Sequence, residues 1–413
     1  MVDFFKIAAE DIEYEVLNLK QITLEVTSLC NLKCSYCCYG ELYRPEKRKE
    51  SFLSFQKVKK IFDFLFEFWS HYQIGRIKTY VSFYGGEPLL AMELIKEIID
   101  YIEKNKKNDR LFVYSMTTNG VLLDRYIDFL VDNSIEILVS LDGDQKCNSY
   151  RINNDGHNSY HAVYRNLKMI KKEYPFFFEK YISFNSVLHN RNSVLKINRF
   201  FKKQFDKVSN ISELSEVGIK SEKILLYDKM HVNYGDSMLK DDVSSEEAKE
   251  MGLKKPELDV LSEYFRVYSG NMYEDYNDLL TDDSKRRRMQ TGTCIPFSKK
   301  MFLTTDGDIL PCERISLKYA YGKVTEERID LDYENIAIVF NGYLSKIKHL
   351  CSKCYAAKHC LQCMYQLDLI EKRYCSSFLT KEGFANYEKR NLQYLYNSID
   401  DNLKIVYLLK LNK

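Results

Sequence analysis

Long apolar segments are absent from this sequence of 413 residues. The most apolar stretch, Ile61 to Trp69, is interrupted by Asp63 and Glu67 and is far shorter than the ~20 residues that a membrane-spanning helix needs. Residues Met1 to Leu19 include five acidic side chains and no apolar run, which excludes a secretory signal and a transit peptide. We therefore expect a cytoplasmic protein with no membrane partner.

An excess of one charge is also missing. The 61 Lys and Arg residues nearly balance the 59 Asp and Glu residues, leaving a net charge of +2. No strong positive field is available to attract a polyanion, so we expect no nucleic-acid partner. No solenoid repeat or low-complexity segment is visible, and 45% hydrophobic with 29% charged residues is typical of a globular protein. The length predicts two or three domains, or one large barrel with an appendage.

Cysteine is what the sequence does have, with twelve in one chain. In a reducing compartment so many cysteines indicate metal ligands or catalytic groups rather than disulfides. Cys30, Cys34 and Cys37 form a C-x3-C-x2-C pattern on a short polar loop. Four thiolates would close a zinc site or bind every iron of a [4Fe-4S] cube, whereas three leave one iron open to another ligand. The alternative, three thiols packed in a core, suits a polar loop poorly, and we expect the adjacent Cys38 to be a buried thiol outside the motif.

The second group of cysteines lies near the carboxy terminus. Its members are Cys294, Cys312, Cys351, Cys354, Cys360, Cys363 and Cys375. Seven thiolates cannot complete two zinc tetrahedra, although His349 and His359 keep a mixed zinc site open as an alternative. Next to an iron-cluster motif upstream, two further iron-sulfur clusters are favoured.

Apolar segments between these groups alternate with helical patterns. The predicted strands are Ile22 to Thr27, Thr79 to Tyr84, Leu111 to Thr117, Ile135 to Leu141, Tyr181 to Leu188 and Lys223 to Tyr227. The predicted helices are Phe55 to Tyr72, Leu89 to Lys104, Asp124 to Asn133, Ser159 to Glu173 and Ser193 to Phe205, with Asp124 and Ser159 as N-caps. Six such units predict an α/β fold with a parallel sheet, as in a partial (β/α)6 TIM-like barrel.

Four motifs follow the first four predicted strands, where chemistry is found in such barrels. They are Cys30 to Cys37, Gly85-Gly86-Glu87-Pro88, Thr117-Thr118-Asn119-Gly120 and Ser140-Leu141-Asp142-Gly143. Two glycines allow close approach of the backbone to a ligand, and Glu87 supplies an acceptor for an ammonium group. Each motif alone is also an ordinary turn sequence, so their shared position is what favours a site.

The remaining segments carry less information. Asp206 to Pro256 is polar and predicts an irregular connection, and the basic run Lys285 to Arg288 predicts a solvated face. From Gly383 to Lys413 the spacing of apolar residues predicts an amphipathic helix, or two, packed on the body.

The combination of C-x3-C-x2-C with Gly85-Gly86-Glu87-Pro88 resembles the radical S-adenosylmethionine (SAM) enzymes, and Cys294 to Cys375 resembles the SPASM extension of peptide-maturing members of that superfamily. The resemblance implies a partial barrel followed by a small cysteine-rich SPASM domain and a C-terminal helix. The implied segments are an N-terminal extension (1–20), the barrel (21–230), a bridging segment (231–290), the SPASM domain (291–384) and a helical tail (385–413).

The resemblance also implies three [4Fe-4S] clusters and SAM as cofactors. Cys30, Cys34 and Cys37 would hold the cluster that splits SAM to a 5'-deoxyadenosyl radical, which removes a hydrogen from the substrate. The implied contacts to SAM come from Tyr36 at the adenine, and from Gly85, Gly86, Glu87, Thr118, Asn119, Ser140, Arg151 and Asn185. Arg151 would bind the SAM carboxylate, with a surface position as the alternative.

In the extension, the resemblance assigns Cys294, Cys312 and Cys363 to one auxiliary cluster, and Cys351, Cys354, Cys360 and Cys375 to the other. The spacing departs from the commoner pattern, because two residues separate Cys360 from Cys363 and a Gly-Gly pair is missing. Glu313 occupies the place of an acidic base in sulfatase maturases, with a solvent-facing carboxylate as the alternative.

The motifs and the resemblance lead to three candidate functions for the protein. The first is a peptide maturase that closes a thioether, carbon-carbon or ether crosslink in a ribosomally made precursor peptide. The second is an anaerobic sulfatase-type maturase that makes formylglycine, and the third is a zinc-binding interaction module. About twenty residues precede the first predicted strand, so recruitment of the peptide by a separate leader-recognition protein is one expectation. A flavodoxin or ferredoxin is the expected electron donor.

Overall fold

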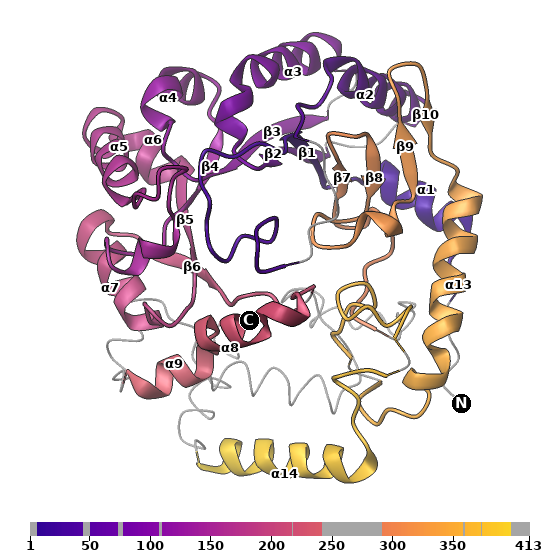
Figure 1. The fold of residues 1–413 in the computed structure, drawn as a ribbon. Helices are drawn as coiled ribbons and strands as arrows, with labels where there is room; N and C mark the ends of the chain where they lie inside the picture. The colour runs from indigo at the N-terminus through magenta and orange to yellow at the C-terminus, as the bar shows by residue number, and fades with distance from the viewer. Residues whose placement is uncertain are drawn as a thin grey trace, which may run out of the picture. The chain divides into compact units, whose positions relative to one another are not determined.

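A computed structural model describes residues 6–43, 50–72, 77–106, 110–216, 218–241, 291–357, 360–372 and 374–397 (Figure 1). Contacts divide the chain into two compact units, each assembled from separate stretches. Glu10–Glu247 and Pro296–Ile336 form the first, which we call the sheet unit. Met1–Ala9, Ala248–Ile295 and Ala337–Lys413 form the second, which we call the cysteine-rich unit.

Six parallel strands form the frame of the sheet unit, and they pair in the order of the sequence. They are β1 (Gln21–Thr27), β2 (Lys78–Gly85), β3 (Leu111–Thr118), β4 (Glu136–Ser140), β5 (Ile182–Val187) and β6 (Ser209–Ser212). The connecting helices are α2 (Phe55–Ser70), η1 (Pro88–Ala91) with α3 (Met92–Asn105), α4 (Leu123–Asp132), α5 (Tyr160–Glu173), α6 (Pro175–Tyr181) and α7 (Val194–Phe205). The strands curve into an open arc, and helices α2 to α7 lie along its outer side (Figure 1). The predicted partial barrel is therefore confirmed.

The core lies between the arc and its helices. Ile22, Leu24 and Val26 of β1 are fully buried, and α2 buries a face with three-to-four spacing that includes Ile61 and Leu65. Removing this apolar surface from water provides the main drive for closing the two layers. The first five strands and all five predicted helices appear within a few residues of their predicted bounds.

The predicted sixth strand is wrong. Lys223 to Tyr227 belongs to η3 (Ser221–Lys223) and α8 (Ile224–Met230), whose Tyr227 and Met230 are buried three residues apart. The sixth strand is Ser209–Ser212, which lacks a hydrophobic pattern and is specified by its pairing with β5. Further on, α9 (Tyr234–Lys240) makes the predicted irregular connection partly helical.

The two predicted N-caps differ from the structure. Helix α4 has Leu122 at its N-cap, so Asp124 lies in the first turn instead. Ser159 does occupy the N-cap position of α5, but its hydroxyl makes no capping bond. Its hydroxyl oxygen accepts a hydrogen bond from Asn148 Nδ2 at 3.2 Å, so tertiary contact replaces the cap.

Four short strands extend the sheet beyond β1. They are β7 (Met301–Leu303), β8 (Asp308–Leu310), β9 (Gly322–Val324) and β10 (Ile329–Asp330). Strand β7 runs parallel to β1, and β8 to β10 follow as antiparallel neighbours, giving ten strands in one sheet. The chain thus returns to the first strand after residue 295, a pairing that connects segments almost 280 residues apart.

Two long helices follow, α13 (Tyr333–Cys351) and α14 (Lys381–Asn397). Helix α14 agrees with the predicted start of the helical tail, and residues 398–413 lie outside the described part of the chain. The predicted bridging segment beyond Asp241 and the basic run 285–288 also lie outside it. None of the helices described is both long and apolar enough to cross a membrane.

Candidate cofactor site

The loop that carries the first three cysteines follows β1 directly; we call residues 30–37 the cluster loop. Two backbone bonds attach it to the connection after β4, from Lys33 N to the Ile152 oxygen (2.7 Å) and from Ser35 N to the Tyr150 oxygen (3.1 Å). A turn closes its end, where Cys37 N donates to the Cys34 oxygen at 3.0 Å. These bonds therefore fix the backbone of the loop around Cys34 and Cys37.

The three thiols lie near one another, since a charge on Cys37 affects the ionisation of Cys30 and Cys34, and a charge on Cys30 affects that of Cys34. Burial raises the pKa of Cys30 to about 11 and that of Cys34 to about 12, and a negative charge on Cys37 raises both further. A hydrogen bond from the Cys38 thiol lowers the pKa of Cys37 to about 7. Three converging thiols that need deprotonation are a suitable ligand set for three irons of a cluster, which would leave the fourth iron to an exogenous ligand.

A site for a single metal ion is not found in the described part of the chain. Across the described ranges, no group of three or more His, Cys, Asp or Glu side chains is placed to hold one ion. The expected burial of Cys38 is wrong, since this residue is exposed beside the loop.

The glycine pair after β2 packs against the start of the cluster loop. A Cβ atom on Gly86 would lie 2.1 Å from the backbone oxygen of Leu29, and Gly85 has a φ of +139°. The approach allows Gly86 N to donate to Thr27 O and Glu87 N to Leu29 O, each at 2.8 Å. The glycine pair thus allows a close approach to the chain's own backbone, and the expected approach to a ligand stays a prediction.

Glu87 is fully buried between this turn and the end of β3. Its carboxylate accepts hydrogen bonds from Leu89 N (3.1 Å), Thr118 Oγ1 (2.6 Å) and Asn119 N (2.7 Å). Burial raises the pKa of Glu87 to about 7, against the lowering effect of the three donors. Glu87, which was expected to accept from an ammonium group, thus already accepts from the chain itself and joins the end of β2 to the end of β3.

The raised pKa of Glu87 makes the stability of the metal-free protein depend on pH. The folded state keeps the proton up to about pH 7, whereas the unfolded chain loses it near pH 4.5. The free energy of unfolding should therefore fall between these values, by up to ~3 kcal/mol from this residue. Glu87→Gln should remove that dependence. The difference in free energy of unfolding between variant and wild type, measured with urea, should therefore change between pH 4.5 and pH 8.

Glu93→Gln is the matched control, because that side chain is 85% exposed on α3. Its difference from the wild type should be constant with pH. Equal pH profiles for Glu87→Gln and the wild type would contradict the assignment.

Asn119 links the end of β3 to the first cysteine. Its Nδ2 donates to Asn31 Oδ1 at 2.7 Å and lies 3.8 Å from Cys30 Sγ. Thr118, buried beside it, donates to Glu87 and accepts from Gly120 N at 3.0 Å. Asn119 of this motif therefore contacts the cluster loop, as the position of the motif at the end of β3 predicts.

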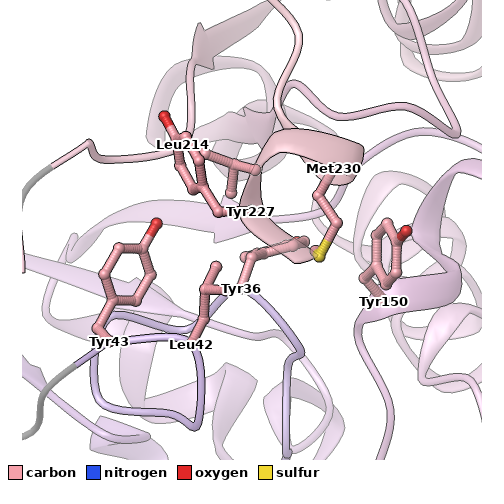
Figure 2. Close-up of a cluster of buried hydrophobic side chains, with 7 residues drawn as sticks. All are labelled: Tyr36, Leu42, Tyr43, Tyr150, Leu214, Tyr227 and Met230. Carbon is pink, nitrogen blue, oxygen red and sulfur yellow. The ribbon is translucent and has the colours of Figure 1, made fainter. Parts of the chain in front are cut away.

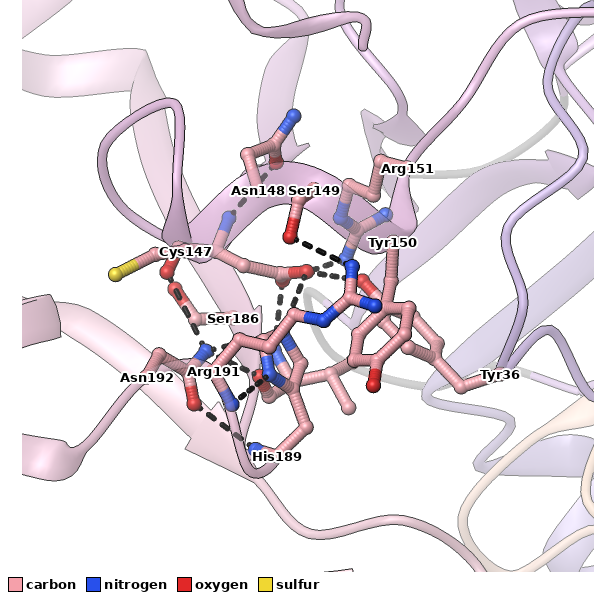
Figure 3. A network of polar contacts seen from close by, with 12 residues as sticks. Tyr36, Cys147, Asn148, Ser149, Tyr150, Arg151, Ser186, His189, Arg191 and Asn192 are labelled. Carbon is pink, nitrogen blue, oxygen red and sulfur yellow. Dashed lines mark hydrogen bonds and ion pairs between the residues drawn. The ribbon is translucent and has the colours of Figure 1, made fainter. Parts of the chain in front are cut away.

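A buried polar network occupies the ends of β4 and β5 (Figure 3). Arg151 Nη2 donates to Asp142 Oδ1 at 3.0 Å, and both side chains are buried. The alternative of a surface position for Arg151 is therefore wrong, because the Asp142 carboxylate holds the guanidinium inside. Ser140 and Asn185 are paired neighbours in the β4–β5 register, next to this network.

The guanidinium of Arg151 still has donor capacity. Its Nε is buried and has no hydrogen-bond partner among the described residues. Its positive charge also lowers the pKa values of Cys34 and Cys37, so it lies close to the cluster loop. A buried cation with an unused donor fits the carboxylate of SAM, which the resemblance assigns to it.

Tyr36 lies inside the protein rather than at an open surface. It is 7% exposed, its hydroxyl donates to Asp142 Oδ2, and its ring stacks on His189 at 5.8 Å between centroids. The Arg151 guanidinium lies 5.4 Å from the ring centroid. An adenine contact at this residue would therefore involve its backbone more readily than its ring.

A layer of apolar side chains covers the end of the cluster loop. This apolar layer consists of Tyr36, Leu42, Tyr43, Tyr150, Leu214, Tyr227 and Met230 (Figure 2). The segment after β6 brings the last three, and Tyr43 OH donates to Ser215 O at 2.9 Å. This segment shields the loop from water on that side.

Glu313 lies in the sheet unit after β8, next to Cys312. Its carboxylate pairs with Lys300 Nζ at 3.1 to 3.2 Å, and its side chain is 15% exposed, so the solvent-facing alternative is wrong. Burial raises the pKa of Tyr84, and negative charges on Cys38, Glu313 and Cys37 add to the effect. The acidic group and the cluster loop therefore lie around the same tyrosine.

The cysteine-rich unit brings four cysteines of the second group together. Burial raises the pKa of Cys351 to about 12, and charges on Cys360, Cys375 and Cys354 raise it further. Cys294 and Cys363 belong to the same unit, whereas Cys312 belongs to the sheet unit. His349 is exposed, with Nδ1 2.9 Å from the Lys346 oxygen, and His359 lies outside the described residues.

Asp142 and His189 were missed as site residues. Asp142 stands in the motif that closes β4, so its position could have been noticed. His189 follows β5 by two residues and carries no motif, and only the folded arrangement reveals it.

Residues 24–192, from β1 to the network after β5, match the model of the Radical SAM superfamily. These residues form a radical SAM domain. Over 179 residues it is 28% identical to the radical SAM cyclopropyl synthase TigE of Paramaledivibacter caminithermalis, covering 41% of this chain and 35% of that protein. Over 194 residues it is 26% identical to the cysteine-type anaerobic sulfatase-maturating enzyme of Clostridium novyi, covering 45% of this chain and 49% of that protein.

A solved structure, native anSMEcpe with bound AdoMet and Cp18Cys peptide, matches 92% of this chain and 98% of its own, with a TM-score of 0.55 and 20% identity. That likeness concerns the fold. The chain spans about a third to a half of the length of the two curated relatives. All motifs from Cys30 to Arg151 lie within the radical SAM domain.

Proposed function

We propose that this protein uses its radical SAM domain to modify a ribosomally made peptide. The convergence of Cys30, Cys34 and Cys37 on one loop is the observation that carries the proposal. A cluster held there would supply the electron that splits SAM and starts radical chemistry. The chain's own part is to bind both groups, orient them and exclude water.

Several side chains support a site for SAM beside that cluster. Arg151 offers a buried cation with an unused donor, and Ser140 and Asn185 lie next to it on β4 and β5. We propose that Arg151 binds the SAM carboxylate and that the turn at Gly85 to Glu87 forms the wall at the amino group. Glu313, held by Lys300, is proposed as the acid–base group facing the substrate.

Crosslink formation is the first candidate reaction, in agreement with the notable similarity to a cyclopropyl synthase. Joining two side chains removes two hydrogen atoms, one of them by the radical derived from SAM. The other leaves as a proton and an electron. The cysteine-rich unit favours this reaction, because the group around Cys351 can hold an auxiliary cluster that receives the electron.

Formylglycine formation is the second candidate. It is supported by the similarity to a sulfatase-maturating enzyme and by the fold shared with anSMEcpe, which has been solved with a peptide. The two reactions give different products, since a crosslink loses two hydrogens and keeps both side chains, whereas formylglycine replaces the cysteine sulfur by oxygen. Mass spectrometry of treated peptides distinguishes them.

Anaerobic reconstitution tests the cofactor count. Three clusters of four irons predict about 12 iron atoms per chain and little zinc.

Cys375→Ala should lower iron by about four, leave SAM cleavage intact and stop product formation with short peptides encoded beside the gene. Cys147→Ala, in a buried cysteine outside both groups, is the control and should keep full iron. Full product from Cys375→Ala would remove the second auxiliary cluster from the reaction, and zinc in place of iron would favour the interaction module.

A further inference from the structure

Asp142 receives more polar contacts than an ion pair with Arg151 requires. Its Oδ1 accepts from Arg151 Nη2 at 3.0 Å and from Val187 N at 2.9 Å. Its Oδ2 accepts from the hydroxyl of Tyr36 and lies 3.6 Å from His189 Nε2. This fully buried carboxylate therefore joins the cluster loop to β5 and to the connection after β4.

His189 is oriented to complete this arrangement. Its Nδ1 accepts from Arg191 N at 3.1 Å, so the proton of a neutral ring is on Nε2. The nearby Asn192 Nδ2 donates to the Val187 oxygen at 2.9 Å and lies 3.2 Å from Nε2, which is 3.6 Å from the Asp142 carboxylate. His189 thus packs beside the carboxylate and stacks on Tyr36.

Tyr36 stands between two of the three cysteines of the loop. Its neighbours Cys34 and Cys37 are one or two residues away, so a displacement of Tyr36 moves both thiols. The other attachments of the loop on this side are the two backbone bonds from Lys33 and Ser35. The hydroxyl of Tyr36 is therefore a side-chain link between this part of the loop and the ends of β4 and β5.

We propose that Asp142 is a positioning residue that holds Cys34 and Cys37 in place through the hydroxyl of Tyr36, with His189 as its support. This inference rests on the proposed function, since it assumes that the loop holds an iron-sulfur cluster. A charge-assisted hydrogen bond to a buried carboxylate is among the stronger polar contacts in proteins. Losing it should loosen the loop without changing the packing of the ring.

Tyr36→Phe is the direct test, because it removes the hydroxyl alone. In anaerobically reconstituted protein, release of iron to a chelator should be about tenfold faster than in the wild type. The EPR spectrum of the reduced protein with SAM added should also change. Tyr150→Phe is the matched control, since the ring of Tyr150 contacts that of Tyr36. The hydroxyl of Tyr150 donates to Asn190 and does not contact Asp142. It should keep the wild-type spectrum and an iron-release rate within about twofold.

A double variant tests whether the effect passes through Asp142. If it does, Tyr36→Phe should add nothing to the iron-release rate of Asp142→Asn. Melting temperatures of the metal-free proteins should be similar for Tyr36→Phe and Tyr150→Phe, which separates positioning from general stability. Multiplied effects in the double variant, or a wild-type rate in Tyr36→Phe, would overturn the proposal. Wild-type protein that assembles no cluster at all would instead overturn the proposed function.

Discussion

Cys30→Ala should abolish the cleavage of SAM under anaerobic, reducing conditions. The thiol lies on the loop that we propose supplies three ligands, and removing one would leave two thiolates for a cluster that needs three from the protein. Formation of 5'-deoxyadenosine, measured by chromatography after addition of dithionite, should fall to the background without enzyme. Iron content should drop by about four atoms per chain.

Cys38→Ala is the matched control for this experiment, because Cys38 adjoins the loop and is exposed. Its loss removes one hydrogen bond to Cys37 but no ligand, so cleavage of SAM should persist. If Cys30→Ala cleaved SAM as fast as Cys38→Ala, the loop would not be the cofactor site.

The positions of the motifs could be predicted because one rule connects them. Parallel strands place their carboxyl ends at one edge, so motifs that follow successive strands must be neighbours. The structure brings Cys30, Asn119 and Glu87 into contact by this rule, with β1, β2 and β3 side by side. Strong local signals, such as the buried apolar face of α2, made the helices between them equally predictable.

Partner identities could not be predicted in the same way. The sequence suggests that Gly86 and Glu87 approach a ligand, but it does not reveal that Leu29 and Thr118 are the groups they contact. Likewise β6 has polar residues at three of its four positions, so its strand state depends on β5 rather than on its own pattern. Contacts between distant segments decide these points, and a single sequence does not contain them.

Arg151 is another residue whose contact partner could not be predicted from the sequence, and its contact has a larger effect on stability. Nothing near it in the sequence predicts burial, yet it pairs with Asp142 nine residues earlier in the interior. Burial is the largest effect and acts to raise the pKa of Asp142, but the charges and hydrogen bonds of Arg151 and His189 together outweigh it and bring the pKa to about 2. The carboxylate is therefore ionised at neutral pH and depends on this cation.

Arg151→Met should consequently destabilise the metal-free protein by about 3 to 5 kcal/mol, because Asp142 would remain buried without its cation. Urea unfolding at pH 8 measures this loss. Lys104→Met is the control, since Lys104 pairs with Asp100 at 2.7 Å on an exposed helix face, and it should cost less than about 1 kcal/mol.

The pH dependence of the loss identifies its cause. Without Arg151, burial should raise the pKa of Asp142, so the carboxyl of the variant takes up a proton at a higher pH than in the wild type. Protonation removes the buried charge, and the deficit of Arg151→Met should therefore shrink as the pH is lowered from 8 to 5. A deficit that is constant over this range would mean that Arg151 contributes by packing alone, and a loss under about 1 kcal/mol would show that the ion pair does not stabilise this site.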